Sequence, residues 1–476
     1  MDNYYKDRKT KIICTIGPSS NTKEMIEKMH EKGMDIARLN FSHGTHEEHL
    51  KIINIIKEIN ETLEIPIGIM LDTKGPEIRI GKFKEPIILK DNDKIIITTE
   101  EIEWCDDKCI QISYQNISKI VENGSLIYIA DGTVELRVDS IKDTKIECTV
   151  SIGGEVNTRK NVNIPGSIVD LPAISEQDID DIEFGIKHGI DFIAQSFVKT
   201  PQDILEVRKI LANHNADHIH IIAKIESFQA LDLLDEIIDI SDGIMVARGD
   251  LGVQIPIENI PSVQKIIIHK CNIKGKPVIT ATQMLESMTK NPRPTRAEAT
   301  DVANAIIDGS DAVMLSGETA SGKHPLRAID IMDKISRKTE KTLKTIKIFD
   351  DTNYKPTITD SISRSVCHIS SDLQAAAIIT CTSTGHTARQ ISRHKPLTPI
   401  IAVTPNEKEF RKLILVWGVR PVLIPYPENT DELINTTLAI IKSKGLVQEF
   451  DLVVITAGIP FNVAGNINLM KIELIK

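Results

Sequence analysis

The sequence has no long uninterrupted apolar run, and aromatic residues make up only 4% of it. No stretch approaches the roughly 20 apolar residues of a membrane-spanning helix. The N-terminal segment MDNYYKDRKTK also lacks the apolar centre of a secretion signal. We therefore expect no membrane partner. With so few aromatic rings, the core must consist mainly of aliphatic side chains, and isoleucine is abundant throughout.

Cysteine is also scarce, and the 57 Lys and Arg residues are outnumbered by 67 Asp and Glu residues. The seven cysteines are scattered, and the closest pair, Cys105 and Cys109, has no second Cys or His pair nearby to complete a zinc site. Reduced thiols in a cytoplasmic protein are the expected state. The formal net charge of −10 argues against nucleic acid as a main partner. An anionic ligand would need locally concentrated positive charge or metal ions.

Short Ile- and Val-rich runs alternate with amphipathic segments in two separated parts of the chain. The first part contains eight runs that we predict as strands: KIICTIG (from Lys11), MDIARLNFS (from Met34), PIGIMLDT (from Pro66), DFIAQSF (from Asp191), HIIAKIE (from His220), DGIMVARGD (from Asp242), KPVITATQ (from Lys276) and DAVMLSGE (from Asp311). Eight buried strands alternating with helices close a (β/α)8, or TIM, barrel. A doubly wound open sheet is the alternative, because alternation alone does not distinguish the two.

The 476 residues are too many for one core, and the pattern divides them. Between the third and fourth strands, β-rich runs such as LIYIADGTVELRV are separated by Gly and Asp-Gly turns. We predict a small β-barrel lid domain at residues 76–170, inserted between barrel halves at 1–75 and 171–345. A C-terminal α/β domain with a parallel sheet is predicted at 346–476, where AAAIITCTS, TPIIAVTP, VRPVLIP and DLVVITAG alternate with helices.

Polar side chains stand at the ends of the predicted barrel strands. Arg38, Asn40 and Ser42 are spaced two apart, as are Lys224 and Glu226, so each set shares one face if its strand persists. Other strand ends carry Asp72, Asp250, Thr282 and Ser316. For any one of them an ordinary solvated strand end is an equally good explanation. Together they favour a site, because all these ends meet at one rim of a barrel.

The charges on this rim suit phosphoryl transfer. Glu226 and Asp250 are ligands of the kind that a hard divalent cation prefers, and Arg38 and Lys224 would face one anion from two sides. The glycines of ARGDLG are expected to form a turn whose N–H groups also face an anion. A Schiff-base lyase or aldolase is an alternative for Lys224, although a neighbouring carboxylate keeps an amine protonated. A non-catalytic metabolite sensor is a third class.

One segment nearly matches a phosphate-binding P-loop. GETASGKH, residues 317–324, fits the pattern G-x-x-x-x-G-K but has His324 where Ser or Thr is required. Pro325 is expected to begin the next helix. Because other residues of the rim already supply ligands for metal and phosphate, we interpret the segment as a loop that brings Ser316 and Glu318 to the barrel mouth.

Several long segments resemble the pyruvate kinase family, and they span the whole chain: ARLNFSHG, LDTKGPEIR, IHIIAKIESFQAL, VARGDLGVQIP, TATQMLESM, NPRPTRAE and AVMLSGETASGK. The resemblance implies a cytoplasmic, glycolytic phosphotransferase that moves the phosphoryl group of phosphoenolpyruvate to ADP, giving pyruvate and ATP. It also implies Mg²⁺ or Mn²⁺, K⁺ and a homotetramer. The additional C-terminal phosphohistidine-type domain of some bacterial members is not expected.

The resemblance further implies a role for each matching residue. Arg38 would hold the substrate phosphate, Lys224 would stabilise the transferring group and the enolate, and Thr282 and Ser316 would lie near the proton donor. The remaining assignments are Glu226 and Asp250 for Mg²⁺; Gly249, Asp250 and Thr282 for the substrate carboxylate; Asn40, Ser42, Asp72 and Thr73 for K⁺; and Asn40, Phe41, Ser42, His43, Arg79 and Lys160 for the nucleotide. Glu77 is the residue that goes with K⁺ dependence in this family.

A possible effector loop lies in the C-terminal part of the chain. In CTSTGHTARQISR, a glycine and several hydroxyls precede a predicted helix, namely Thr382, Ser383, Thr384, Gly385, His386 and Thr387. Such a loop suits a phosphate, although a plain helix cap fits equally well. Since the family binds a phosphorylated activator here, we expect a sugar phosphate or AMP as effector. The segment AGIPFNVAGNIN carries no Lys or Arg, which disfavours fructose 1,6-bisphosphate.

Overall fold

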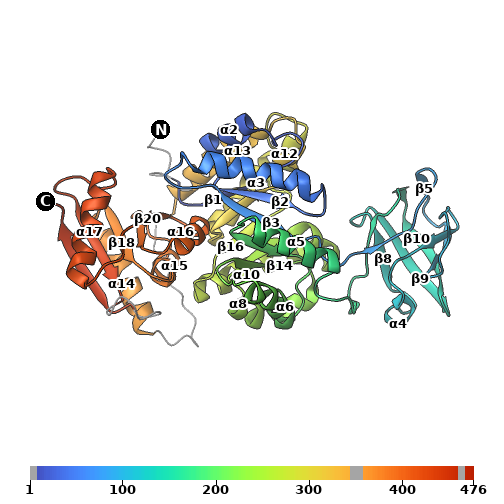
Figure 1. The fold of residues 1–476 in the computed structure, drawn as a ribbon. Coiled ribbons are helices and arrows are strands. Elements are labelled where there is room, and N and C mark those ends of the chain that lie inside the picture. The colour runs from blue at the N-terminus through green and yellow to red at the C-terminus, as the bar shows by residue number, and fades with distance from the viewer. Residues whose placement is uncertain (1–7, 344–356, 459–466) are drawn as a thin grey trace.

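The computed structural model describes residues 8–343, 357–458 and 467–476, and a closed barrel of eight parallel strands lies at its centre (Figure 1). The strands are β1 (Lys11–Thr15), β2 (Ile36–Asn40), β3 (Gly68–Asp72), β13 (Phe192–Gln195), β14 (His220–Ile225), β15 (Gly243–Ala247), β16 (Val278–Ala281) and β17 (Ala312–Leu315). All eight predicted strands are therefore present. Because β1 pairs with both β2 and β17, the sheet closes and the open-sheet alternative is wrong.

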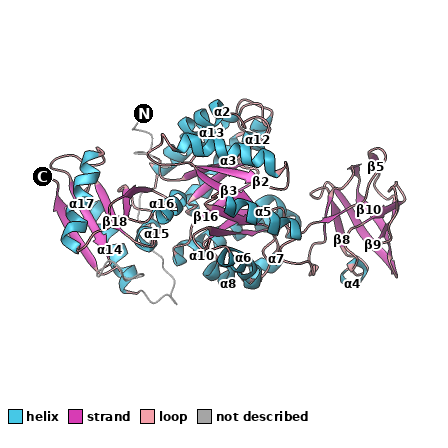
Figure 2. Cartoon of the chain, in the orientation of Figure 1, coloured by secondary structure: helices cyan, strands magenta, loops and turns pink. Residues whose placement is uncertain are grey.

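Helices cover the outside of this barrel (Figure 2). The main ones are α2 (Lys23–Lys32), α3 (His46–Asn60), α5 (Glu176–Lys187), α6 (Pro201–Asn213), α8 (Leu234–Ile240), α10 (Ile260–Lys274), α11 (Arg296–Asp308) and α13 (Pro325–Glu340), with the short helices α7 (Phe228–Asp232), α9 (Arg248–Gln254) and α12 (Gly317–Ala320). Thr45, Ser175 and Thr295 begin their helices with reciprocal capping boxes. Pro325 occupies the first turn of α13, as predicted. None of the helices in the described ranges is long and apolar enough to cross a membrane.

The barrel interior is filled mainly by aliphatic side chains. One cluster of inward-facing residues takes a side chain from each strand: Ile13, Ile36, Met70, Phe192, Ile222, Met245, Ile279 and Met314. Their neighbours in sequence, such as Ile12 and Ile193, point outward and pack under the helices, following the two-residue period of a strand. At Gly68 an added Cβ would lie 3.3 Å from the ring of Phe192, so this glycine leaves space for the large ring.

A β domain is inserted after β3 and extends to one side of the barrel (Figure 1). It contains β4 (Ile78–Arg79), β5 (Ile87–Leu89), β6 (Lys94–Thr98), β7 (Cys109–Gln111), α4 (Ile117–Ile120), β8 (Leu126–Ile129), β9 (Val134–Lys142), β10 (Lys145–Ile152), β11 (Gly154–Val156) and β12 (Asn161–Asn163). Its strands form a seven-stranded and a two-stranded sheet around a separate aliphatic core. The inserted all-β domain that the turn pattern indicated is therefore present.

The chain leaves the barrel for this domain through a conformation that requires glycine. Gly75 has a φ of +72°, and a Cβ there would lie 2.6 Å from the Phe197 ring and 3.0 Å from Cβ of Ser196. The N–H of Gly75 donates to the Asp178 carboxylate at 3.0 Å. The exit is thus packed tightly against the loop that follows β13.

The C-terminal domain lies on the opposite side of the barrel (Figure 1). Its elements are α14 (Ile358–Asp372), β18 (Ala377–Cys381), α15 (His386–Ser392), β19 (Ile400–Thr404), α16 (Glu407–Lys412), β20 (Val419–Leu423), α17 (Thr430–Ser443), β21 (Leu452–Ala457) and β22 (Leu469–Leu474). The four predicted strands are parallel, but β22 is an additional antiparallel edge strand. Its alternating Lys471 and Glu473 suit an edge and interrupt the apolar pattern that marked the other strands. Residues 459–466 of the segment AGIPFNVAGNIN lie outside the described residues.

Aspartates mark the N-terminal ends of alternate barrel strands. Asp35, Asp191, Asp242 and Asp311 directly precede or begin β2, β13, β15 and β17. Their carboxylates accept hydrogen bonds from neighbouring-strand N–H groups, at 2.7 Å from Ile12, 2.8 Å from Ile69, 2.9 Å from Ile221 and 3.0 Å from Val278. Each aspartate therefore accepts a backbone N–H of a neighbouring strand and places a negative charge at the N-terminal end, or bottom, of the barrel.

The C-terminal domain binds two of these charges. Arg411 donates to Asp191 at 2.7 Å, and Lys395 donates to Asp311 at 2.7 Å. The ring of Trp417 lies between two ammonium groups, 5.1 Å from Nζ of Lys395 and 5.3 Å from Nζ of Lys9. Ion pairs and cation–π contacts thus hold the C-terminal domain against the barrel end that lies away from the predicted site.

We expect the substitution Lys395→Met to lower the free energy of unfolding by about 3 kcal/mol, because Asp311 would remain buried without its cation. Both side chains of this pair are more than nine-tenths buried. The matched control is Lys28→Met, which removes an exposed pair with Glu24 and should cost far less. Urea unfolding followed by circular dichroism measures both. Equal losses in the two variants would contradict the structural role of the buried pair.

Candidate active site

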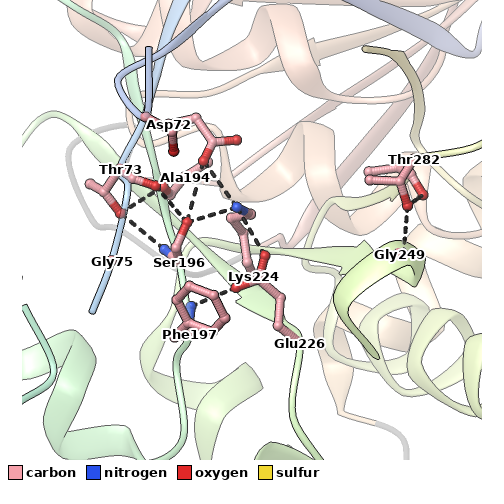
Figure 3. Close-up of polar contacts among 12 residues, drawn as sticks. Asp72, Thr73, Gly75, Ala194, Ser196, Phe197, Lys224, Glu226, Gly249 and Thr282 are labelled. Atoms are coloured by element: carbon pink, nitrogen blue, oxygen red, sulfur yellow. Dashed lines mark hydrogen bonds and ion pairs between the residues drawn. The ribbon is translucent and has the colours of Figure 1, made fainter. Parts of the chain in front are cut away.

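The ammonium group of Lys224 lies at the centre of a polar cluster on the C-terminal rim of the barrel (Figure 3). Near the end of β14, its Nζ lies 3.0 Å from Oδ1 of Asp72, 2.9 Å from Oε1 of Glu226 and 2.7 Å from Oγ of Ser196. The ammonium group donates hydrogen bonds to Asp72 and Ser196, and Glu226 adds an ion pair. Burial alone would lower the pKa of Lys224, but Asp72 and Glu226 raise it above its ordinary value. The side chain stays charged.

Asp72 joins this lysine to Arg38. The Asp72 carboxylate, 1% exposed, accepts from Nε of Arg38 at 2.6 Å, and Arg38 also donates to Oγ1 of Thr15 at 2.9 Å. Burial opposes ionisation of Asp72, but Arg38 and Lys224 outweigh it and lower the pKa of the carboxyl group. Two cations from β2 and β14 thus share one buried anion at the rim.

Glu226 and Asp250 form a carboxylate pair beside Lys224. Glu226 is 1% exposed and accepts the N–H of Phe197 at 2.6 Å. Burial and repulsion from Glu226 raise the pKa of Asp250 to about 7. A cation between the two carboxylates would relieve this repulsion, and the buried oxygen donors suit a hard divalent ion. Within the described ranges no group of three or more His, Cys, Asp or Glu could hold a metal ion, so such an ion would also need oxygens of substrate or water.

Thr282 and Gly249 meet on the next part of the rim (Figure 3). The N–H of Gly249 donates to Oγ1 of Thr282 at 2.9 Å. The segment ARGDLG was expected to form a glycine-rich turn, but the structure shows residues 248–254 as the helix α9. Arg248 fixes this junction, because it donates to the carbonyl of Thr282 at 2.6 Å and to Asp301 at 2.6 and 2.8 Å. Thr282 has a φ of +62°, which is unusual for a β-branched residue.

The four residues assigned to K⁺ lie close in sequence to β2 and β3. Thr73 is buried next to Asp72, and its N–H donates to the carbonyl of Ala194 at 3.0 Å. Strand β2 ends at Asn40, so the expected shared face does not extend to Ser42. Instead, the Ser42 N–H donates to Oδ1 of Asn40 at 3.2 Å across a turn. All four side chains carry oxygen, the atom that a hard monovalent cation prefers.

The residues assigned to the nucleotide divide between the barrel and the β domain. Phe41 is buried and stacks on His49 at 4.0 Å, whereas His43 is exposed. Arg79 of β4 pairs with Glu77 and donates to the carbonyl of Arg159 at 2.8 Å. Lys160 is exposed, and its carbonyl accepts the N–H of Ile80 at 2.9 Å.

An open cleft of about 670 Å³ lies between the β domain and the rim. Glu77, Asn161 and Asn163 line it from one side, and Lys199 and Asp250 line it from the barrel. Gln254, also in its lining, donates to Asn163 at 3.1 Å. The cleft therefore connects Asp250 to the base of the inserted domain.

Ser316 and Glu318 occupy the rim after β17. The Glu318 carboxylate is fully buried and accepts from the N–H groups of Ser316 at 2.7 Å and Leu285 at 3.0 Å. Among the described residues, Oγ of Ser316 has no hydrogen-bond partner although it is buried. Residues 317–320 form α12 and precede the first turn of α13. The near P-loop is thus the short helix α12 and the turn before α13 rather than a simple loop, and Glu318 links the chain after β16 to the chain after β17.

Comparison with known proteins agrees with this geometry. Residues 7–329 match the profile of the pyruvate kinase barrel domain, and residues 360–473 match that of the pyruvate kinase alpha/beta domain. The chain belongs to the pyruvate kinase family.

The similarity covers nearly the whole chain. A pyruvate kinase of Clostridium acetobutylicum is 47% identical, across 98% of this chain and 100% of the relative. A pyruvate kinase of Geobacillus stearothermophilus is 48% identical across 98% of this chain and 80% of the relative. The crystal structure of a pyruvate kinase from Cryptosporidium parvum superposes with a TM-score of 0.92 at 41% identity, covering 100% of this chain and 98% of the other. As a family member, the chain is a phosphotransferase with a glycolytic role.

The loop assigned to a pyruvate kinase effector lies between β18 and α15. Gly385 has a φ of +71° and directly precedes the helix, which begins at His386. Thr382 and Thr387 are buried, whereas Ser383 is partly exposed. Arg389 donates to the carbonyl of Thr384 at 3.1 Å. The loop therefore has the conformation expected before a helix, with a buried guanidinium behind it.

Sequence reasoning missed two polar residues of this pyruvate kinase site. Ser196 follows β13 and contacts Lys224, and Arg248 follows β15 and holds the Thr282 loop. A signal for both was present, because each lies near the C-terminal end of a predicted barrel strand. Their roles depend on contacts across the rim, which the sequence of one strand does not contain.

We expect Arg248→Met to lower kcat about tenfold or more, because the loop that carries Thr282 would lose its anchor. Asp301→Asn is the matched control, since it weakens the ion pair of Arg248 while leaving the hydrogen bond to the Thr282 carbonyl. Steady-state rates of both variants, with melting temperatures, measure the difference. An equal loss of kcat in Asp301→Asn would show that the ion pair, not the loop contact, is responsible.

Proposed function

We propose that Lys224, Arg38, Glu226, Asp250 and Thr282 carry out the transfer of the phosphoryl group of phosphoenolpyruvate to ADP. The observation that supports this most directly is the charged Lys224 ammonium, held within 3.0 Å of the carboxylates of Asp72 and Glu226. A buried cation at this position, with Arg38 on the same anion, stabilises charge that develops on a transferring phosphoryl group.

The carboxylate pair would hold the divalent cation, which we propose is Mg²⁺ or Mn²⁺. When bound there, such an ion would supply positive charge to neutralise substrate oxygens. Glu226 keeps its orientation through the Phe197 N–H, and Asp250 extends from the first turn of α9. Burial and repulsion from Glu226 together raise the pKa of Asp250, and a bound cation would relieve the repulsion.

The protein's own residues complete the reaction. Arg38 orients the phosphate for in-line attack by ADP, and Lys224 stabilises the enolate that remains after transfer. Gly249, Asp250 and Thr282 would position the substrate carboxylate. Protonation of the enolate carbon requires a donor near Thr282 and Ser316. The buried and unpartnered Oγ of Ser316 supports a place for an ordered water there.

Nucleotide binding is proposed at the mouth of the cleft. Asn40, Phe41, Ser42 and His43 would contact ADP from the barrel, Phe41 through its backbone because its ring is buried against His49. Arg79 and Lys160 would approach the phosphates from the β domain as it closes over the cleft. Closure would exclude water and strengthen the charge interactions inside.

We propose that the wider properties follow the family as well. These are K⁺ bound by Asn40, Ser42, Asp72 and Thr73, a cytoplasmic location, a homotetramer, and a sugar phosphate or AMP bound at residues 382–387. The exposed apolar side chains of Met470, Ile472 and Leu474 on the edge strand β22 support contact with another subunit. We also propose the domain limits expected from the sequence, which are 1–75, 76–170, 171–345 and 346–476.

We expect Lys224→Met to fold normally and to lower kcat at least about 100-fold, because the transition state would lose its buried cation. A coupled assay of ATP formation from ADP and phosphoenolpyruvate measures the rate. Lys209→Met, which removes an exposed lysine of α6, is the control and should retain the wild-type rate. Near-normal turnover by Lys224→Met would overturn the assignment.

We also expect K⁺ to activate the enzyme, because Glu77 occupies the position that goes with K⁺ dependence. Replacing K⁺ with a bulky organic cation in sodium-free buffer should lower the rate about tenfold or more. Glu77→Lys should reduce this dependence by supplying a fixed positive charge. Full activity of the wild-type enzyme without K⁺ would rule out the monovalent site.

A further inference from the structure

Ser196 is one of two hydrogen-bond acceptors of the Lys224 ammonium, and it is the uncharged one. Its Oγ lies 2.7 Å from Nζ of Lys224, closer than either carboxylate oxygen of Asp72 or Glu226. The residue directly follows β13 and is 2% exposed. We infer that Ser196 is a positioning residue that fixes the Lys224 ammonium for phosphoryl transfer and joins it to the backbone of Thr73.

The serine itself is held rigidly by Thr73. The Ser196 hydroxyl donates to the carbonyl of Thr73 at 2.6 Å, and the Ser196 N–H donates to Oγ1 of Thr73 at 3.0 Å. A hydroxyl has one proton, and the Thr73 carbonyl is closer than Oδ1 of Asp72, which lies at 3.4 Å. The lone pairs of Oγ are therefore directed to Lys224. Backbone and side chain together fix the position of this acceptor.

The backbone around Ser196 adds further constraint. Gly75 would place a Cβ only 3.0 Å from Cβ of Ser196, so the chain leaving the barrel packs directly on this residue. The next residue, Phe197, has a φ of +52° and gives its N–H to Glu226 at 2.6 Å. One short segment thus orients both the lysine and a carboxylate of the proposed metal pair.

Charge and position can be separated at this residue. Substitution of Asp72 or Glu226 would change the net charge around Lys224, whereas removal of the Ser196 hydroxyl leaves every charge in place. Without it, the ammonium keeps one hydrogen-bond acceptor, Asp72, and its ion pair with Glu226, so it is free to move toward either carboxylate. Second-sphere hydrogen bonds of this kind typically change activity about 10- to 100-fold. The loss should appear in the rate of transfer and not in ground-state binding.

This inference rests on the proposed role of Lys224 and also involves the proposed K⁺ shell. The carbonyl of Thr73 accepts the Ser196 hydroxyl with one lone pair, which leaves the other for a cation. Loss of the hydroxyl would change the orientation of this carbonyl. A single substitution should therefore alter both turnover and the response to K⁺.

The experiment compares Ser196→Ala and Ser196→Cys with the wild-type enzyme. We expect Ser196→Ala to lower kcat about 10- to 100-fold while KM for phosphoenolpyruvate changes less than about threefold, because Arg38 still binds the phosphate. The K⁺ concentration for half-maximal activity should rise about threefold or more. Ser196→Cys keeps the volume but offers a weak acceptor, so its kcat should stay close to that of the alanine variant.

Ser310→Ala is the matched control. Ser310 is a fully buried serine at the other end of the barrel, with its Oγ 2.7 Å from Oγ1 of Thr280. The Ser310→Ala variant should show the same decrease in melting temperature as Ser196→Ala, whereas its kcat and its response to K⁺ should not change. A kcat for Ser196→Ala within twofold of the wild type would overturn the inference. Recovery of kcat by Ser196→Cys would also overturn it, because volume rather than hydrogen bonding would then explain the loss.

Lys224→Met, measured alongside, separates this inference from the proposed function. An inactive Lys224→Met with a fully active Ser196→Ala would remove the positioning role and leave the role of Lys224 intact. An active Lys224→Met would remove both.

Discussion

The buried positive charge of Lys224 imposes the main constraint on this site. A lone ammonium group would lose its proton in a barrel interior, because burial favours the neutral amine. Asp72 and Glu226 reverse this tendency, and Asp72 itself depends on Arg38 to remain ionised. Lys224 thus stays charged only with its carboxylate neighbours, and Asp72 stays charged only with Arg38. Substitution of one of these residues is therefore expected to change the ionisation of the others. The residues of the rim come from strands that are far apart in sequence and adjacent in the barrel.

The same principle organises the opposite end of the barrel for a different purpose. There, Asp191 and Asp311 satisfy strand N–H groups and receive cations from the C-terminal domain. Charges at the top pair with one another across neighbouring strands, whereas charges at the bottom pair with cations of the C-terminal domain. The C-terminal ends of the eight strands therefore carry the candidate active site, whereas their N-terminal ends carry the contacts with the C-terminal domain.

The sequence was sufficient for the barrel, the inserted β domain and the residues of the rim, because strand period and strand-end position are local properties. It was insufficient where partners are distant. Lys395 and Asp311 are 84 residues apart, and no sequence pattern near either residue predicts their ion pair. Ser196 is an ordinary serine until the barrel brings it to Lys224. Strand β22 was missed because the charged Lys471 and Glu473 interrupt the apolar pattern used to recognise strands. The segment ARGDLG was predicted as a turn because it contains two glycines, although a segment that follows a barrel strand can also begin a helix.

Trp417, placed between Lys9 and Lys395, has a spectroscopic consequence. The chain contains two tryptophans, and the other, Trp104, belongs to the inserted β domain beside Lys84. The barrel itself has no indole. Tryptophan fluorescence therefore comes from the two outer domains, and none of it comes from a residue of the barrel between them. Emission from the buried Trp417 reflects how the C-terminal domain sits on the barrel, and emission from the half-exposed Trp104 reflects the environment of the β domain.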